Sequence, residues 1–203
     1  MSIQGQTYKT KYIIDKADSI LKFRVGDALY QYFTYNTNSY YKYRGFNNKS
    51  HGQALIKSKK TKGKFIKANV RFWFDYSLIK GIYGIAHLNF DSNLNLIDSL
   101  TLDFIPDFLW NNKKCNFISS DTALKIAIDS IKEKGLFEIK PFLHFDSKHR
   151  RYVYEINNIL KQKKGEINYI EYTESLIEVI RVDAISKEIL YHSINWSDPD
   201  FGF

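Results

Sequence analysis

The order of helical and strand-like patterns along this chain restricts its fold more than any other feature. One helical pattern starts at Asp15 or Asp18 and ends near residue 35, and a second runs from residue 119 or 120 to Gly135. Several runs follow each helix, either alternating between apolar and polar residues or short and apolar. A helix followed by neighbouring strands favours the α+β class over an alternating parallel α/β fold.

The clearest strand pattern lies at residues 64–76, where Ile66, Phe72 and Phe74 fall on one side and Arg71 on the other. The tyrosine-rich residues after the first helix form either a strand or an ordered loop. Further strands are predicted at 82–90, 96–105, 139–145, 151–160, 167–172, 176–183 and 188–194, with turns that include 91–95 and 162–165.

These elements predict two helix-plus-antiparallel-sheet units, residues 1–112 and 113–203, packed as one compact body. The two halves also share a local pattern, because Phe90-Asp91 and Val182-Asp183 each close a strand and precede a short polar turn. We therefore expect a tandem repeat of two related units.

Composition predicts a folded chain without a membrane-spanning helix. Of the 203 residues, 44% are hydrophobic and 16% aromatic, which is enough to bury a sizeable core. No run approaches about 18 apolar residues, so no transmembrane segment is expected. The start of the sequence lacks the basic patch and apolar core of a secretory signal. The protein is therefore cytoplasmic, or it is periplasmic, envelope-bound or secreted if a signal peptide was removed.

Positive charge is concentrated in one segment. The formal net charge is +8, and the Lys and Arg residues between Asp27 and Asp75, with no Asp or Glu among them, more than account for it. The densest part, residues 57–64, is predicted to be an exposed loop. The candidate binding residues are the cations of this basic loop and of the strand after it: Lys57, Lys59, Lys60, Lys62, Lys64, Lys67 and Arg71.

A basic loop attracts phosphates, acidic membrane surfaces or an acidic protein by long-range electrostatics. Tyr40, Tyr41, Tyr43 and Phe46 lie near these cations in the sequence and are able to stack on bases. The other interpretation is a solvated hairpin that only keeps the protein soluble. The sequence leaves both interpretations open.

No pattern in the sequence is a signature of catalysis, and we expect neither an enzyme nor a cofactor. Asp91, Asn93 and Asn95 have the spacing of a calcium loop, but Leu102 stands where that loop needs its last carboxylate. A hairpin turn is predicted there instead.

No metal site is expected either. The only cysteine, Cys115, lies in a connector and is predicted to be inert, which also excludes an internal disulfide. The five histidines lack the spacing of a helical metal site, although His87, His144 and His192 lie on predicted strands and could converge.

Residues 119–193 resemble a PepSY-type domain. The resemblance rests on the helix at 123–127, on residues 152–156, and on residues 177–184 followed by 186–190. In such domains a strand commonly ends in Val-Asp-Ala before a glycine-containing turn, and here Lys187 replaces the glycine. The resemblance implies one helix against an antiparallel sheet, in a bacterial envelope or secreted protein that binds or inhibits other proteins. We expect the aspartate of the pattern to hold the turn by accepting backbone N–H groups two residues on.

Two functional hypotheses follow. The first is a non-enzymatic protein-binding or inhibitory module with a PepSY/cystatin-like architecture, in the envelope of a bacterium. The alternative is a cytoplasmic or phage-derived protein that binds nucleic acid or an acidic protein through the basic loop. An exposed strand edge is a second candidate surface, because an unpaired strand accepts a partner strand.

Overall fold

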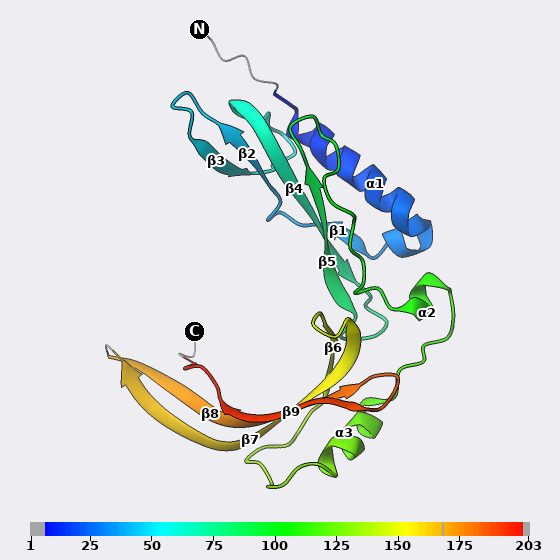
Figure 1. Ribbon diagram of the computed structural model, residues 1–203, viewed down its shortest axis with the longest axis vertical. Helices are drawn as coiled ribbons and strands as arrows, with labels where there is room; N and C mark the ends of the chain where they lie inside the picture. The colour runs from blue at the N-terminus through cyan, green and yellow to red at the C-terminus, as the bar shows by residue number, and fades with distance from the viewer. Residues whose placement is uncertain (1–6, 168, 201–203) are drawn as a thin grey trace. The chain divides into compact units, whose positions relative to one another are not determined.

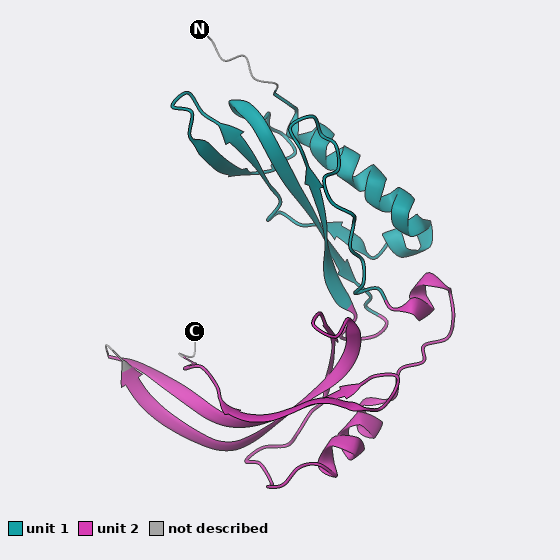
Figure 2. Ribbon diagram, in the orientation of Figure 1, with its two compact units in different colours: residues 1–77, 83–105 teal, residues 78–82, 106–203 magenta. Residues whose placement is uncertain are grey.

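The computed structural model describes residues 7–167 and 169–200, without the side chain of Ile167. The chain divides into unit 1, residues 1–77 and 83–105, and unit 2, residues 78–82 and 106–203 (Figure 2). Each unit combines helix with antiparallel sheet, which confirms the predicted α+β class. Residues 78–82 group with the second unit, a feature that the sequence-based division at residue 112 does not contain.

The sheet of unit 1 is built around one long strand, β4. β4 pairs with β5 along one edge and with both β1 and β2 along the other, and β3 pairs with β2 (Figure 1). The tyrosine-rich segment is therefore a strand of a hairpin. The antiparallel strands are β1 (Phe33–Tyr35), β2 (Tyr40–Arg44), β3 (Ser50–Ala54), β4 (Lys64–Asp75) and β5 (Tyr83–Phe90).

Helix α1 (Thr10–Tyr30) covers one face of this sheet (Figure 1). It starts earlier and ends earlier than predicted, and Gly26 interrupts it with φ 75° and ψ 164°, a backbone conformation that glycine adopts without steric cost. The core of unit 1 consists of apolar side chains from α1 and the strands, among them Ile13, Ile14, Ala17, Leu21, Val70, Phe72, Phe74, Ala86, Leu88 and Phe90.

The period-two prediction for β4 holds except at its start. The register between β2 and β4 shifts between Lys42 and Tyr43, so one strand carries an extra residue there. Phe65 is consequently buried, whereas Ile66, which a strict alternation places in the core, is only half-buried.

The strand expected at 96–105 does not form in the described residues. Leu96 makes a single bridge to Phe90, and the Ile97 N–H donates to the Asn89 carbonyl at 2.8 Å. Leu102, Phe104 and Ile105 are nevertheless buried, because this part of the segment packs on the core, with the Phe104 ring centroid 5.7 Å from that of Phe74, whereas Leu96 and Ile97 are exposed.

The sheet of unit 2 is a meander in chain order: β6 (Phe142–Asp146), β7 (Arg151–Ile167), β8 (Ile170–Asp183) and β9 (Ile189–Trp196). The turn predicted at 162–165 is wrong, because these residues continue β7 and pair with β8. Opposite charges across the strands favour the longer hairpin, since Lys163 forms an ion pair with Glu174. The Lys163 ammonium also lies 4.7 Å from the Trp196 ring centroid.

Helix α3 (Ser120–Ile128) packs on the unit 2 sheet, and the short helix α2 (Asp107–Trp110) precedes it. Of the two residues at which the sequence predicts the helix to begin, Ser119 is its cap, because the Ser119 hydroxyl accepts the Thr122 N–H at 3.2 Å. The core combines Ala123, Ala127, Ile156, Ile180 and Val182.

The sequence predicts that the helix continues to Gly135, but the helix ends at Ile128. Gly135 lies instead in a loop against β7, where a Cβ atom would come 1.9 Å from Asn158 Oδ1. The glycine is therefore required by a close approach and not by a helix end.

Gly84, a half-buried residue of β5 beside Phe104, gives a direct test of this packing. A Cβ at Gly84 would lie 2.3 Å from Cγ of Phe104, whereas a Cβ at Gly52 on β3 would meet no atom within 4 Å. We expect Gly84→Ala to lower the free energy of unfolding in urea by about 1–3 kcal/mol. The matched control Gly52→Ala is expected to change it by less than about 0.5 kcal/mol. Equal stability of the two variants would contradict the described packing of Phe104.

Candidate functional site

The basic loop, residues 57–64, is fixed against the start of α1. The Thr10 N–H donates to the Lys59 carbonyl at 2.9 Å, and the Thr61 N–H donates to the Tyr8 carbonyl at 2.9 Å. The buried Thr61 hydroxyl accepts the Tyr8 N–H at 2.9 Å. The lysines of the loop remain exposed, as predicted, on a backbone that hydrogen bonds hold in place.

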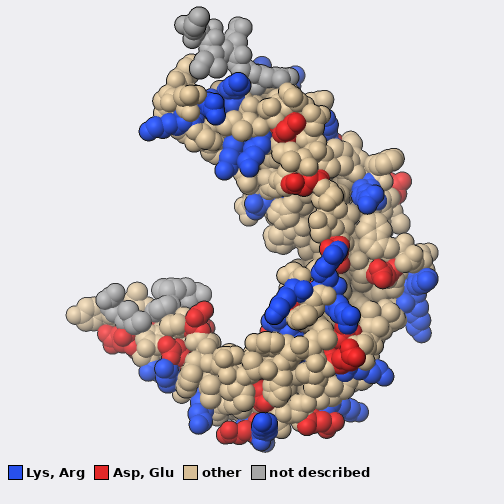
Figure 3. Space-filling model, in the orientation of Figure 1, with Lys and Arg blue, Asp and Glu red and all other residues tan. Residues whose placement is uncertain are grey.

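Two lysines of this loop line a pocket of about 820 Å³ beside the β2–β3 turn. We call it the hairpin groove and define it by six lining residues: Tyr43, Arg44, Phe46, His51, Lys62 and Lys64. Among the described lining residues none is Asp or Glu. Figure 3 shows Lys and Arg side chains gathered over the end of unit 1 that carries β2 and β3.

Local backbone geometry builds the groove. The Gly45 N–H donates to the Lys49 carbonyl at 3.1 Å, and Asn48 has φ 58°, a left-handed conformation that asparagine tolerates in turns. Gly63 has φ 53°, and a Cβ there would lie 2.4 Å from the Arg44 carbonyl oxygen. Only glycine lets the basic loop approach β2 this closely, so Gly63 brings the loop lysines next to Arg44.

The groove joins cations to aromatic faces. The imidazole of His51 stacks on Tyr43 with ring centroids 5.4 Å apart, and Phe46 is fully exposed. Guanidinium and ammonium groups bind carboxylates and phosphates, and aromatic rings add contact area for a planar or apolar body. With cations and aromatic faces but no carboxylate among the described lining residues, the groove is suited to binding an anion.

The structure does not bring all of the predicted binding residues together. Lys57, Lys59 and Lys60 do not line the groove. The Lys57 ammonium lies 5.7 Å from the Tyr35 ring centroid, and Lys60 forms a β-bridge with Lys9 beside α1. Only Lys62 and Lys64 of the predicted set line the groove.

Lys67 and Arg71 do not line the groove; they lie on the face of the unit 1 sheet opposite α1, which we call the open face. Arg71 is held there by Asn69, whose Oδ1 accepts the Arg71 Nε–H at 2.6 Å. The guanidinium lies 5.6 Å from the Tyr40 ring centroid, a cation–π geometry.

Arg44 and His51 are groove residues that sequence reasoning did not select. The signal that could have found them is Asn47-Asn48, a turn dipeptide between two strand-like segments. A hairpin across that turn places His51 opposite Tyr43, which is the observed register. The sequence alone allows residues 40–46 to form either a strand or a loop, so it does not predict this pairing.

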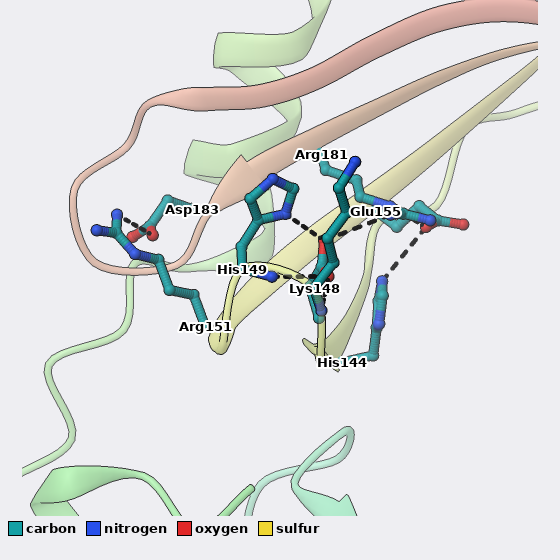
Figure 4. A network of polar contacts seen from close by, with 8 residues as sticks. His144, Lys148, His149, Arg151, Glu155, Arg181 and Asp183 are labelled. Carbon is teal, nitrogen blue, oxygen red and sulfur yellow. Dashed lines mark hydrogen bonds and ion pairs between the residues drawn. The ribbon is translucent and has the colours of Figure 1, made fainter. Parts of the chain in front are cut away.

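A polar network crosses the sheet of unit 2 (Figure 4). Arg181 Nε donates to Glu155 Oε2 at 2.6 Å, and Arg181 Nη1 lies 3.4 Å from Asp146 Oδ2. Each carboxylate also has a histidine, with His149 Nδ1 2.9 Å from Asp146 Oδ2 and His144 Nε2 3.3 Å from Glu155 Oε2. The His144 contact lacks hydrogen-bond geometry.

This network is a structural feature of the β6–β7 turn. Asp146 Oδ1 accepts the Lys148 N–H at 2.9 Å and the His149 N–H at 3.3 Å. Burial opposes ionisation of Asp146, but the hydrogen bonds from His149 and Lys148 outweigh it and hold the pKa of Asp146 below its ordinary value. A carboxylate in this state is a weak base, so we assign it to holding the turn.

A second buried cluster lies on the α3 side of the same sheet. Glu178 Oε1 is 2.8 Å from His192 Nε2, and Glu178 Oε2 accepts a hydrogen bond from Asn158 Nδ2 at 2.8 Å. Asn158 Nδ2 also donates to the Glu133 carbonyl at 2.9 Å. The cluster ties β7, β8 and β9 to the loop after α3.

The histidines predicted to lie on strands do not gather into a metal site. His144 contacts Glu155 on one face of the unit 2 sheet, His192 contacts Glu178 on the other, and His87 belongs to unit 1. Within residues 7–167 and 169–200, no three His, Cys, Asp or Glu side chains are placed to hold a metal ion. Cys115 is exposed.

Both strand-closing aspartates cap turns. Asp91 Oδ1 accepts the N–H groups of Asn93 and Asn95, each at 2.8 Å, which confirms the turn predicted at that site. Asp183 Oδ1 accepts the N–H groups of Ile185 at 2.8 Å and Ser186 at 2.7 Å, which confirms its predicted role. The shared local pattern therefore has one physical cause, an Asx turn after a buried strand.

The pKa of Asp183 predicts a pH dependence of stability. Burial raises the pKa of the Asp183 carboxyl group. The hydrogen bonds from the Ser186 and Ile185 N–H groups and the charge of Arg151 outweigh this effect, so the pKa lies below its ordinary value. The stabilisation is therefore present above pH about 4 and is lost as the pH falls through the folded-state pKa. We expect Asp183→Asn to lower the free energy of unfolding by about 1–3 kcal/mol at pH 7, with the deficit closing towards pH 2.

Urea denaturation of both proteins between pH 7 and pH 2 measures this difference, with the exposed Asp198→Asn as the matched control. A deficit that stays constant over the whole pH range would contradict the role of the Asp183 charge.

Comparison with protein-family models, with curated proteins and with solved structures gives no match. No helix in the described part of the chain is long and apolar enough to cross a membrane. The functional interpretation therefore rests on the geometry of the hairpin groove, the open face and the unit 2 sheet.

Proposed function

We propose that this chain is a non-enzymatic binding protein and that the hairpin groove of unit 1 binds an anionic partner. One observation carries the proposal: Arg44, Lys62 and Lys64 meet at a concave surface beside two aromatic rings, and no acidic side chain lines it. Cations that serve only solubility are expected to be dispersed and interspersed with acids.

The way in which the groove is assembled supports the same proposal. Bringing like charges together costs electrostatic free energy, and here a left-handed Gly63 and hydrogen bonds to Tyr8 and Thr10 maintain that arrangement. An anionic ligand removes the repulsion, so the site gains more from an anion than dispersed lysines would.

Charge reversal in the groove tests the proposal. We expect the triple variant Arg44→Glu, Lys62→Glu and Lys64→Glu to elute from immobilised heparin, a generic polyanion, at much lower salt than the parent protein. Long-range attraction depends on the net charge of the protein as well as on where its charges lie. The control variant must therefore change the net charge by the same amount.

The control is a triple reversal of exposed lysines in unit 2, Lys113→Glu, Lys132→Glu and Lys134→Glu. It is expected to reduce the elution salt only slightly. An equal reduction in the two variants would show that net charge alone attracts the polyanion, and it would remove the groove from the account.

Unit 2 supports a second candidate function, the binding of a protein partner. In its described residues helix α3 packs on a four-stranded antiparallel sheet, the architecture that the PepSY resemblance implies. Lys187, which replaces the family's usual glycine, has φ 69°, a conformation that glycine adopts at lower cost. These features support a PepSY-like binding module of a bacterial envelope protein, a proposal that leads to the edge strand.

β9 is that edge strand, since it pairs with β8 alone among the described strands. Apart from His192 its residues are uncharged, so it lacks the lysines that commonly protect sheet edges. The Ser197 N–H donates to the Ser175 carbonyl at 2.8 Å, and the antiparallel alternation then directs the backbone groups of Ser193 toward β8 and those of Ile194 outward. A partner strand could pair with the outward groups.

Proline substitution at Ile194 tests this edge. Because the Ile194 N–H points away from β8, Ile194→Pro is expected to leave the unit 2 fold intact and to block strand addition. Ser193→Pro is expected to destabilise unit 2, since it removes a ladder hydrogen bond. In pull-downs from source-cell extract, a partner bound at this edge should be lost with Ile194→Pro and kept with the groove triple variant. Retention of every captured protein by Ile194→Pro would exclude the edge.

A further inference from the structure

The open face of unit 1 carries large aromatic side chains that the fold leaves uncovered. Trp73 is 44% exposed and Tyr83 is 53% exposed, whereas Phe72 and Phe74, their α1-facing neighbours on β4, are buried. The only helix of unit 1 among its described residues, α1, lies on the other side. Two exposed rings on one sheet face form a surface that core packing does not explain.

Strand register places these rings in line with cations. Lys67, Asn69, Arg71 and Trp73 occupy alternate positions of β4 on this face, so Lys67 and Trp73 lie about 20 Å apart along the strand. From the neighbouring strands, Lys42 lies opposite Lys67 and Tyr40 opposite Asn69. On the β5 side, His87 lies opposite Arg71, Ile85 opposite Trp73 and Tyr83 opposite Asp75.

Neighbouring side chains fix the position of the Arg71 guanidinium. Asn89 Oδ1 accepts from Asn69 Nδ2 at 2.8 Å, and Asn69 Oδ1 accepts from Arg71 Nε at 2.6 Å. Tyr40 supports the flat side of the guanidinium. In the described residues these contacts leave both Nη groups without a hydrogen bond, so a phosphate or a base edge can accept from them.

The open face continues from the hairpin groove. Arg44 pairs with Lys64 in the ladder between β2 and β4, and Lys42 pairs with Lys67 in the next part of the same ladder. Two acidic groups lie farther along, Asp75 beside Trp73 and Asp98, which accepts from Asn89 at 3.0 Å. Four cations are therefore neighbours in the β2–β4 ladder where the two surfaces join.

We propose that the open face is a stacking surface for single-stranded nucleic acid, with phosphates along Lys42, Lys67 and Arg71 and bases on Tyr40, Trp73 and Tyr83. The inference rests on the proposed function, since it names the anionic partner of unit 1. An acidic protein segment would satisfy the cations but would leave the exposed rings without planar partners, whereas every base has a face that stacks on an aromatic ring. Proteins that bind single strands without sequence preference combine these two elements.

Intrinsic fluorescence offers a direct test with short oligo(dT) as the probe. The chain has three tryptophans, so a variant with Trp110→Phe and Trp196→Phe keeps Trp73 as the sole tryptophan. We expect oligo(dT) to quench this fluorescence. By fluorescence anisotropy of labelled oligo(dT), Trp73→Ala is expected to weaken binding at least about fivefold, because loss of one stacked base has about that effect.

Three further variants separate stacking from shape and charge. Trp73→Phe keeps a ring and should retain most of the affinity, and Trp110→Ala, which removes a 39% exposed tryptophan of unit 2, should have no effect. Lys67→Gln should reduce the slope of log affinity against log salt by about 0.7, the contribution of one phosphate contact on a single strand.

The outcomes distinguish this inference from the proposed function. Binding of oligo(dT) with equal affinity by Trp73→Ala, or binding of heparin without any binding of oligo(dT), would overturn the inference and leave the groove function standing. Tighter binding of polyglutamate than of oligo(dT) would also overturn it and would identify an acidic protein as the partner. Failure to bind heparin, polyglutamate and oligo(dT) would overturn both.

Discussion

The alternation of β4 is the constraint on which both surfaces of unit 1 depend. One set of its side chains, which includes Phe72 and Phe74, fills the core under α1, and the other set, which includes Lys67, Arg71 and Trp73, faces away from it. Because both sets belong to one strand, the packing that stabilises the core also fixes the spacing of the exposed cations and rings. The extra residue near Phe65 shifts this alternation at the start of the strand, where Lys64 lines the hairpin groove.

Much of the architecture could be predicted from the sequence because its signals are local. The period-two pattern of β4, the Ser119 cap of α3 and the turn at Asp183 each depend on residues a few positions apart. The strand expected at 96–105 was wrong because burial of a loop segment and burial of a strand give similar apolar patterns. The turn between β7 and β8 was predicted too early in the chain, at residues 162–165. These polar residues pair with β8, and no local sequence pattern reveals such a pairing.

The sites were less predictable, since they depend on pairings between distant segments. The density of charge in the sequence predicts Lys62 and Lys64 as binding residues. Arg44 joins them only because the Gly63 backbone approaches it closely, and the sequence does not show this approach. The positions of Lys67 and Arg71 on a strand followed from alternation, whereas the alignment of Tyr40 and Tyr83 with them required the register of β2 and β5. Conversely, Asp146, Glu155 and Arg181 converge without any sequence motif, and their contacts hold a turn.

The central claim is that unit 1 binds an anionic partner along the hairpin groove and β4. Amide hydrogen exchange with and without heparin tests it most directly, because exchange reports which backbone segments become protected. The account predicts added protection in residues 40–54 and 62–73, with residues 142–196 of unit 2 unchanged. Protection confined to unit 2, or no change in unit 1 while heparin is bound, would contradict it.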